Sequence, residues 1–223
     1  AVDENTPNIL YYQCSSHGYM GNHVVNIGNT VNINSVTGQI IPGKIEGTNF
    51  SDSLLIGHST TGSLSSAEDN TGVGIGALDA LTSGDQNTAV GNVAGTAITS
   101  SGKNTGVGAF ALNAVSTSTG FNTAFGRSAL QLTTGSYNTA IGAGAGENIT
   151  SGDGNVIIGK VSADSATGDR QLKIAGYDGS TTTTWISGDS SGNVTVSGTV
   201  TANGETLSAG VSAGFAVAMA IAL

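Results

Sequence analysis

The residues best suited to chemistry lie close together near the start of the chain: Cys14, His17 and Met20. A thiolate, an imidazole and a weakly bound thioether form a ligand set that suits copper in a trigonal site. These three residues are therefore the candidate metal site. The segments that would position them, residues 8–13 and 23–27, are rich in β-branched and aromatic side chains, which predicts two strands paired as a hairpin.

This loop resembles the copper-binding loop of cupredoxins. A cupredoxin also needs a further His tens of residues before the Cys, whereas only 13 residues precede Cys14, and the gap between His17 and Met20 is shorter than in most such loops. We therefore expect residues 1–28 to be the C-terminal hairpin of a cupredoxin-like module without a functional copper site. Two alternatives stay open: a copper site that His23 could supplement, and a packing role for a buried thiol.

Composition and charge exclude several classes of function. The chain has 223 residues, of which 35 are glycines and only 9% are charged. Its formal net charge is −9. Because a phosphate backbone or an anionic membrane surface would be repelled on average, we expect no nucleic-acid partner. The apolar run at residues 214–223 is about half the roughly 20 residues that a membrane-spanning helix needs, so we expect no membrane insertion.

The carboxylates form no catalytic pattern but are scattered along the chain, at Asp79, Asp85, Glu147, Asp153, Asp164, Asp178 and Asp189. Glycoside hydrolysis needs two carboxylates about 5–9.5 Å apart. The chain repeats a unit of about 17 residues, and Asp85 and Asp153 stand in equivalent turns four units apart. If each unit stacks on the next at about 4.8 Å, these two carboxylates are too far apart. We expect no enzyme activity and no cofactor. The turn at residues 151–155 offers oxygen ligands for calcium, but the nonapeptide calcium repeat is absent.

The strongest signal is a tandem repeat of about 17 residues between Ser53 and Gly159. Its first five residues read Asn-Thr-(Gly/Ala)-(Val/Phe/Ile)-Gly, with starts at Asn70, Asn87, Asn104, Asn122 and Asn138 and weaker copies at Ser53 and Asn155. Successive starts are 17, 17, 17, 18, 16 and 17 residues apart. A second apolar position follows about eleven residues into each unit, at Leu64, Leu81, Ile98, Val115, Leu132 and Ile149.

A unit of this length is too short for a helical repeat and suits one coil of a β-solenoid or β-roll. We expect two short strands per coil, stacked about 4.8 Å apart, and an all-β fold. The second apolar positions would form one internal column, and a second column would hold Val73, Val90, Val107, Phe125, Ile141 and Ile158. The first Asn of each unit is expected to form an amide ladder, and the Gly after the first anchor to allow close backbone approach. Because one thin coil buries little surface, we expect three chains to share a core or to pack side by side.

The flanking segments are also predicted to be largely β-structured. Residues 29–52 form a β connector, residues 53–160 the solenoid, and residues 161–205 a β-rich segment with strands at 171–174, 184–186 and 193–200. Residues 206–223 form an apolar C-terminal segment, either a trimeric helix or a strand plug.

The Asn-Thr-Ala-Val-Gly and Asn-Thr-Ala-Ile-Gly units, separated by Thr-Ser-Gly turns, resemble the head repeats of trimeric autotransporter adhesins. With the segments at 169–177 and 181–194, they resemble still more closely the repeats in tail-fibre and other structural proteins of tailed phages, particularly marine cyanophages. The resemblance covers about residues 48–200. It implies a homotrimer in the virion that contacts other virion proteins and serves as a spacer or as a host-attachment fibre for a surface glycan or protein.

Two other functions compete with the phage fibre. A bacterial surface adhesin head is the alternative within the same resemblance, and it would place the protein on the cell surface. An ice-binding solenoid is a rival of a different class, because one Thr per coil would form a ladder at Thr71, Thr88, Thr105, Thr123 and Thr139. Thermal hysteresis of the purified protein separates the ice-binding hypothesis from the other two.

Overall fold

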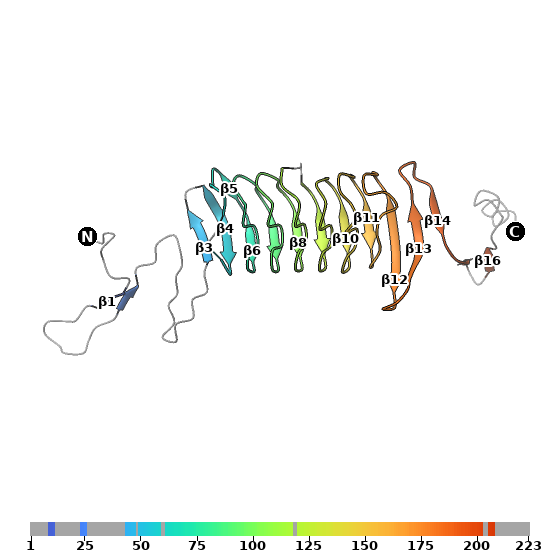
Figure 1. Ribbon diagram of the computed structural model, residues 1–223, viewed down its shortest axis with the longest axis horizontal. Coiled ribbons are helices and arrows are strands. Elements are labelled where there is room, and N and C mark those ends of the chain that lie inside the picture. Colours follow the sequence, from blue (N-terminus) through green and yellow to red (C-terminus); the bar gives the residue numbers. More distant parts are fainter. Residues whose placement is uncertain are drawn as a thin grey trace.

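A computed structural model of the protein describes residues 9–11, 23–25, 43–47, 49–58, 61–117, 120–202 and 205–207. The fold over these residues is all-β, and its main body is a β-solenoid of about seven turns with coils of about 17 residues (Figure 1). The predicted fold class is therefore confirmed. Across the described ranges there is no helix long and apolar enough to cross a membrane.

One twelve-stranded sheet runs along the whole stack. The coil strands pair in parallel and in register; they are β6 (Thr71–Val73), β7 (Thr88–Val90), β8 (Thr105–Val107), β9 (Thr123–Phe125), β10 (Thr139–Ile141) and β11 (Val156–Ile158). The sheet begins with β3 (Gly43–Gly47) and β4 (Phe50–Ile56), and the short β5 (Ala67–Glu68) also pairs with β4. It ends with β12 (Leu172–Tyr177), β13 (Thr182–Gly188) and β14 (Val194–Val196).

Two small hairpins lie outside this sheet. β1 (Ile9–Tyr11) pairs antiparallel with β2 (His23–Val25), as expected for the two segments that flank the loop. That these strands belong to a cupredoxin-like module stays a prediction. β15 (Val200–Ala202) pairs antiparallel with β16 (Glu205–Leu207). The single strand predicted at 193–200 is wrong, because β14 ends at Val196 and β15 begins at Val200.

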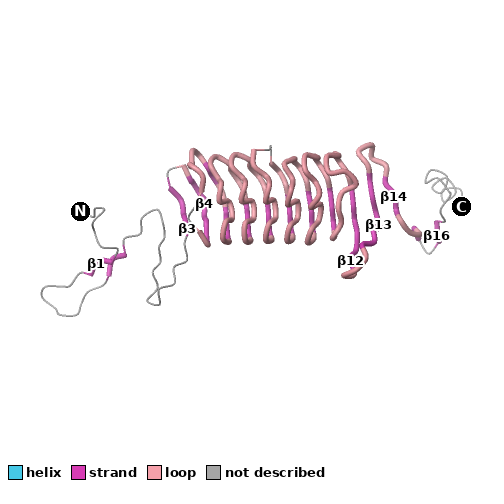
Figure 2. Tube along the Cα trace, in the orientation of Figure 1, coloured by secondary structure: helices cyan, strands magenta, loops and turns pink. Residues whose placement is uncertain are grey.

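Each coil from Asn70 onward contains one strand, and the first coil adds only the two-residue β5, so the prediction of two strands per coil is wrong. Figure 2 shows that the rest of each coil consists of turns. A second strand would have to include Leu78, Leu112 and Leu130 or their neighbours. These three residues have left-handed backbone conformations, with φ of 58°, 52° and 49°, whereas a strand needs strongly negative φ. Its backbone still bonds to the neighbouring coil, as where Leu78 N donates to Ala94 O at 3.2 Å.

The buried asparagines form the predicted amide ladder and hold the coils in register. Asn87 Oδ1 accepts a hydrogen bond from Asn104 N at 3.2 Å and another from Asn104 Nδ2 at 2.9 Å. The same pair of bonds repeats along the ladder, which joins Asn70, Asn87, Asn104, Asn122, Asn138, Asn155 and finally Gln171. At the start of the ladder, Ser53 Oγ accepts from Asn70 N. Every member from Asn70 onward is therefore held by its neighbours inside the rod.

The inward-facing strand residues are one position earlier than predicted. Successive strand side chains point to opposite faces, so an inward Asn87 also turns Ala89 inward and leaves Thr88 and Val90 outward. Ala89 is fully buried, whereas Phe125, at the position equivalent to Val90, is 58% exposed. The predicted inner column of Val73, Val90, Val107, Phe125, Ile141 and Ile158 is therefore wrong, and these residues lie on the outer face of the sheet.

The second apolar column is confirmed at four positions and wrong at one. Leu81, Ile98, Val115 and Ile149 are buried, and the half-buried Leu64 packs against the core. Leu132, however, is 52% exposed, and Thr133 beside it is completely buried. Thr133 lies eleven residues after Asn122, as each of the other four lies eleven after its own Asn, so position in the coil decides burial here and not side-chain polarity.

In two neighbouring coils the sizes of the facing core residues complement each other. Leu112 lies against Gly106, where an added Cβ would be 3.2 Å from Leu112 Cδ1. Gly95 occupies the position equivalent to Leu112, and there the strand carries Ala89 instead of glycine. The core is buried within one chain, so filling it does not require a second chain. The trimer stays a prediction.

The glycine that ends each coil strand brings neighbouring coils into close contact, as predicted. Gly91 has φ of 138°, which favours glycine, and a Cβ there would lie 2.6 Å from the carbonyl carbon of Gly108.

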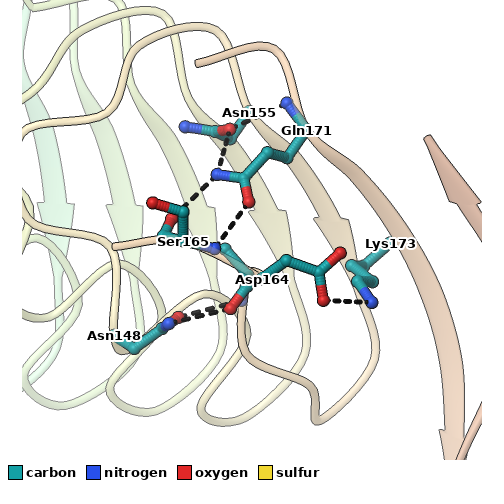
Figure 3. A network of polar contacts seen from close by, with 7 residues as sticks. Asn148, Asn155, Asp164, Ser165, Gln171 and Lys173 are labelled. Carbon is teal, nitrogen blue, oxygen red and sulfur yellow. Dashed lines mark hydrogen bonds and ion pairs between the residues drawn. The ribbon is translucent and has the colours of Figure 1, made fainter. Parts of the chain in front are cut away.

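Polar groups close the C-terminal end of the core (Figure 3). Gln171 ends the amide ladder, and its Nε2 donates to Asn155 Oδ1 at 3.0 Å and to Ser165 O at 2.8 Å. Lys173 occupies the inward position next to Ile157, and its Nζ lies 2.7 Å from the Asp164 carboxylate. The apolar interior therefore ends at an ion pair.

Asn104→Ala should destabilise the solenoid, because the backbone N–H of Asn122 would lose its acceptor inside the core. A buried donor without a partner costs about 1–3 kcal/mol. Asn92→Ala is the matched control, since the exposed Asn92 makes one hydrogen bond of 3.2 Å to Ile75 O, and it should change stability by less than about 0.5 kcal/mol. Urea unfolding followed by circular dichroism measures both, and equal losses would contradict a structural role for the ladder.

Leu130→Ala and Leu132→Ala test which side chain faces the core. Leu130 is fully buried, so its truncation should leave a cavity and cost about 2–5 kcal/mol. Truncation of the exposed Leu132 should cost less than about 0.5 kcal/mol. Thermal unfolding of the two variants compares them directly, and a larger effect at Leu132 would reverse the assignment.

Candidate interaction surfaces

The predicted metal ligands Cys14, His17 and Met20 lie outside the described residues. Only the two strands that flank them, β1 and β2, are described. Within the part of the chain that the structure does describe, no group of three or more His, Cys, Asp or Glu residues could hold a metal ion. The expectation that this loop holds no functional copper site is therefore untested, and the copper site stays an open alternative.

The turn carboxylates bind backbone N–H groups of neighbouring coils. Asp85 Oδ1 accepts from Glu68 N at 2.9 Å, and Asp153 Oδ1 accepts from Ser136 N at 2.7 Å. Asp169 Oδ1 continues the pattern by accepting from Asp153 N at 2.9 Å. Each of these carboxylates thus fastens its own turn to the turn of the coil before it.

The outer face of the coil sheet carries two columns of uncharged side chains. One is a threonine ladder in which Thr71, Thr88, Thr105, Thr123 and Thr139 are direct neighbours. The other is the column of Val73, Val90, Val107, Phe125, Ile141 and Ile158, in which Phe125 and Ile141 are exposed. We call these two columns the Thr/Val face. It presents a row of hydroxyls beside an apolar strip along the rod.

An aromatic pair occupies one corner of the stack, just before the ladder asparagines. The rings of Phe121 and Tyr137 are stacked, with centroids 5.0 Å apart and planes 12° from parallel. The ammonium of Lys103 lies 4.8 Å from the Phe121 centroid. Such contacts contribute about 0.5–1.5 kcal/mol each, so they stabilise the junctions between three successive coils.

The hairpin of β12 and β13 is longer than the coil strands and projects past them (Figure 1). It carries the exposed aromatic side chains Tyr177 and Trp185. An open hollow of about 370 Å³ is lined by Gly176, Tyr177, Asp178, Thr181, Thr183 and Trp185. We call this the hairpin hollow. It combines exposed aromatic rings with hydroxyl and carboxylate groups.

A second hollow of about 490 Å³ lies beside the last coil. Its lining includes the charged residues Glu147, Lys160 and Asp164. Asp164 is already paired with Lys173 in the cap of the core, and the Lys160 ammonium lies 4.1 Å from the Tyr177 ring centroid. Much of the charge in this hollow is therefore committed to structural contacts.

Hydrogen bonds lower the pKa of two carboxyl groups near the hairpin. The amides of Thr181 and Ser180 donate to Asp178 and hold its pKa below the usual value. The side chain and backbone amide of Asn193 do the same for the pKa of Asp189. Both carboxylates thus stay ionised while they organise the turns that follow β12 and β13.

Comparison with protein-family models, with curated proteins and with solved structures found no match. The hairpin hollow was not predicted from the sequence. The available signal was a Trp, the only one in the chain, in a segment rich in Thr, Ser, Asp and Gly.

Acid should loosen the turn at Asp178. A carboxyl whose pKa is lowered by folding stabilises the fold fully above its ordinary value of 3.8, and this contribution is lost as the pH falls through the lowered pKa. We expect the Thr181 amide resonance to shift as the pH falls from about 4 to 2. The Asp178→Asn variant should lack this transition, and an unchanged Thr181 titration in that variant would assign the shift to another group.

Proposed function

We propose that this chain is a structural fibre protein of a phage virion, which serves as a trimeric spacer, as a host-attachment fibre, or as both. The observation that carries the proposal is the uninterrupted in-register stack of coils with a closed core. Such a stack is a stiff rod in which each coil contacts only its neighbours. A rod of this kind suits a part that spans a distance and presents a tip.

The Thr/Val face supports side-by-side packing of several rods. Neither of its columns contains a charged residue, and Phe125 and Ile141 expose apolar surface. Depletion of charge with aromatic enrichment is typical of the buried centre of protein interfaces. A second and third copy aligned along the rod axis would cover this strip on each chain, which favours the homotrimer.

A bacterial surface adhesin head would use the same rod, and the location of the native protein, in virions or on cells, distinguishes the two. Ice binding draws support from the threonine ladder, which is in register over five coils. However, Phe125 and Ile141 extend from the adjacent column and interrupt the flat array that ice recognition would need. We therefore prefer the fibre.

Light scattering tests the trimer. We expect a mass three times that of the 21.9 kDa chain, and we expect Phe125→Asp combined with Ile141→Asp to give single chains, because carboxylates would be buried in the interface. Ile75→Asp is the control, since Ile75 is exposed outside both columns, and it should leave the trimer intact.

A wild-type mass of one chain would overturn the trimer. For the attachment role, phage that lack this protein should adsorb poorly to host cells, and normal adsorption would leave the protein only an architectural role.

A further inference from the structure

A β-bulge aims Trp185 out of the regular sheet. Between β12 and β13, Ile174 is opposite Ile186 while Ala175 is opposite Thr184, so Trp185 is an extra residue on its strand. Bulges of this kind redirect a side chain and are common next to functional sites. The orientation of the indole is therefore set by the backbone of the hairpin.

Gly176 provides the surface against which the indole rests. A Cβ at Gly176 would lie 2.6 Å from Cζ2 and 2.8 Å from Cη2 of Trp185, so the ring lies across the glycine with no space for a larger residue. Trp185 nevertheless remains 54% exposed. The hairpin thus supports part of the indole from below and leaves the rest open to a ligand.

Polar groups surround this aromatic surface. Asp178 Oδ1 accepts from Ser180 N and Thr181 N, so its other carboxylate oxygen can accept bonds from a ligand. Tyr177 Oη donates to Gly179 O at 2.7 Å, which fixes the phenol. The exposed Thr181 and Thr183 add hydroxyls that both donate and accept.

We infer that the hairpin hollow binds an uncharged sugar ring. The C–H groups on one face of a pyranose would pack against the indole of Trp185, while its hydroxyls need the acceptors and donors that Asp178 and the two threonines supply. Small-ligand sites combine an apolar surface with a few placed polar groups in this way, at volumes of about 300–1,000 Å³. The hairpin hollow, at about 370 Å³, suits one ring or a short oligosaccharide.

Charge favours a neutral sugar over an acidic one. Asp178 lines the hollow, and the chain as a whole carries a formal net charge of −9. The residues that line the hollow include no Lys or Arg, and Lys160 lies over the Tyr177 ring. An anionic ligand would therefore meet repulsion without a free cation to offset it. Sugar binding would give the proposed attachment role a ligand class. Its biological meaning rests on that role, whereas the binding itself does not.

Fluorescence provides a direct test, because Trp185 is the only tryptophan in the chain. The full chain is titrated with glucose, galactose, mannose, N-acetylglucosamine and short neutral oligomers of each, with sialic acid as the acidic comparison. We expect a saturable change in emission with at least one neutral sugar. Absence of such a change across the neutral panel, or tighter binding of sialic acid, would overturn the inference.

Variants place the binding site. Gly176→Ala should displace the indole, and Thr183→Val should remove a hydroxyl with little change in shape; each should raise the dissociation constant about tenfold, which corresponds to about 1.4 kcal/mol. The control Tyr137→Ala removes a comparably exposed aromatic ring from the coil stack and should leave the dissociation constant unchanged. If Gly176→Ala fails to fold, Thr183→Val still decides, and wild-type affinity in that variant would overturn the site.

Light scattering on the same samples separates this inference from the proposed fibre. A trimer that binds no neutral sugar rejects the hollow as a sugar site and leaves the trimer standing. A single chain that binds sugar rejects the trimer and retains the site. If iodide fails to quench Trp185 in the assembled protein, a neighbouring chain covers the hollow, and the sugar site is overturned in favour of an interface.

Discussion

The amide ladder inside the rod is the interaction on which the rest of the structure depends. Each ladder asparagine satisfies the backbone N–H and the side-chain amide of the next one, at a position closed to water. A shift of one residue would expose an amide and strand a donor in the core, so the register of every coil is strongly specified. With the asparagine fixed inward, alternation sends the small third residue inward and the threonine and large apolar residue outward.

The turns complete what the ladder begins. Residues such as Leu112 and Leu130 adopt left-handed backbone conformations, which an isolated chain would avoid, and burial of their side chains offsets that cost. Small strand residues opposite them leave the necessary room, as Gly106 does for Leu112. Carboxylates such as Asp153 fasten the outer turns to one another. Backbone strain, packing and hydrogen bonding therefore support the same coil geometry at each repeat.

The sequence allowed the coil length, the all-β class, the asparagine ladder and the close-packed glycines to be predicted, because each follows from a repeat period and a residue type. The inward face was mispredicted because Val90 and Phe125 are more apolar than Ala89, and apolar side chains were expected inside. Leu132 was placed in the core for the same reason. The core position is instead held by Thr133, whose hydroxyl donates to Thr150 O of the next coil. The hairpin hollow depends on the bulge at Trp185 and on Gly176 in the facing strand. Neither the bulge nor the pairing of these two residues follows from a sequence pattern.

The ion pair of Lys173 and Asp164 gives the rod a defined end, and this has a consequence for its evolution. Interior coils are interchangeable, because each one meets only the coil before it and the coil after it. Duplication of a 17-residue unit would lengthen the rod by roughly 4.8 Å, one strand spacing, while the Lys173–Asp164 ion pair and the β12–β13 hairpin keep their surroundings. The length of such a rod can thus change in fixed steps without redesign of the β12–β13 hairpin.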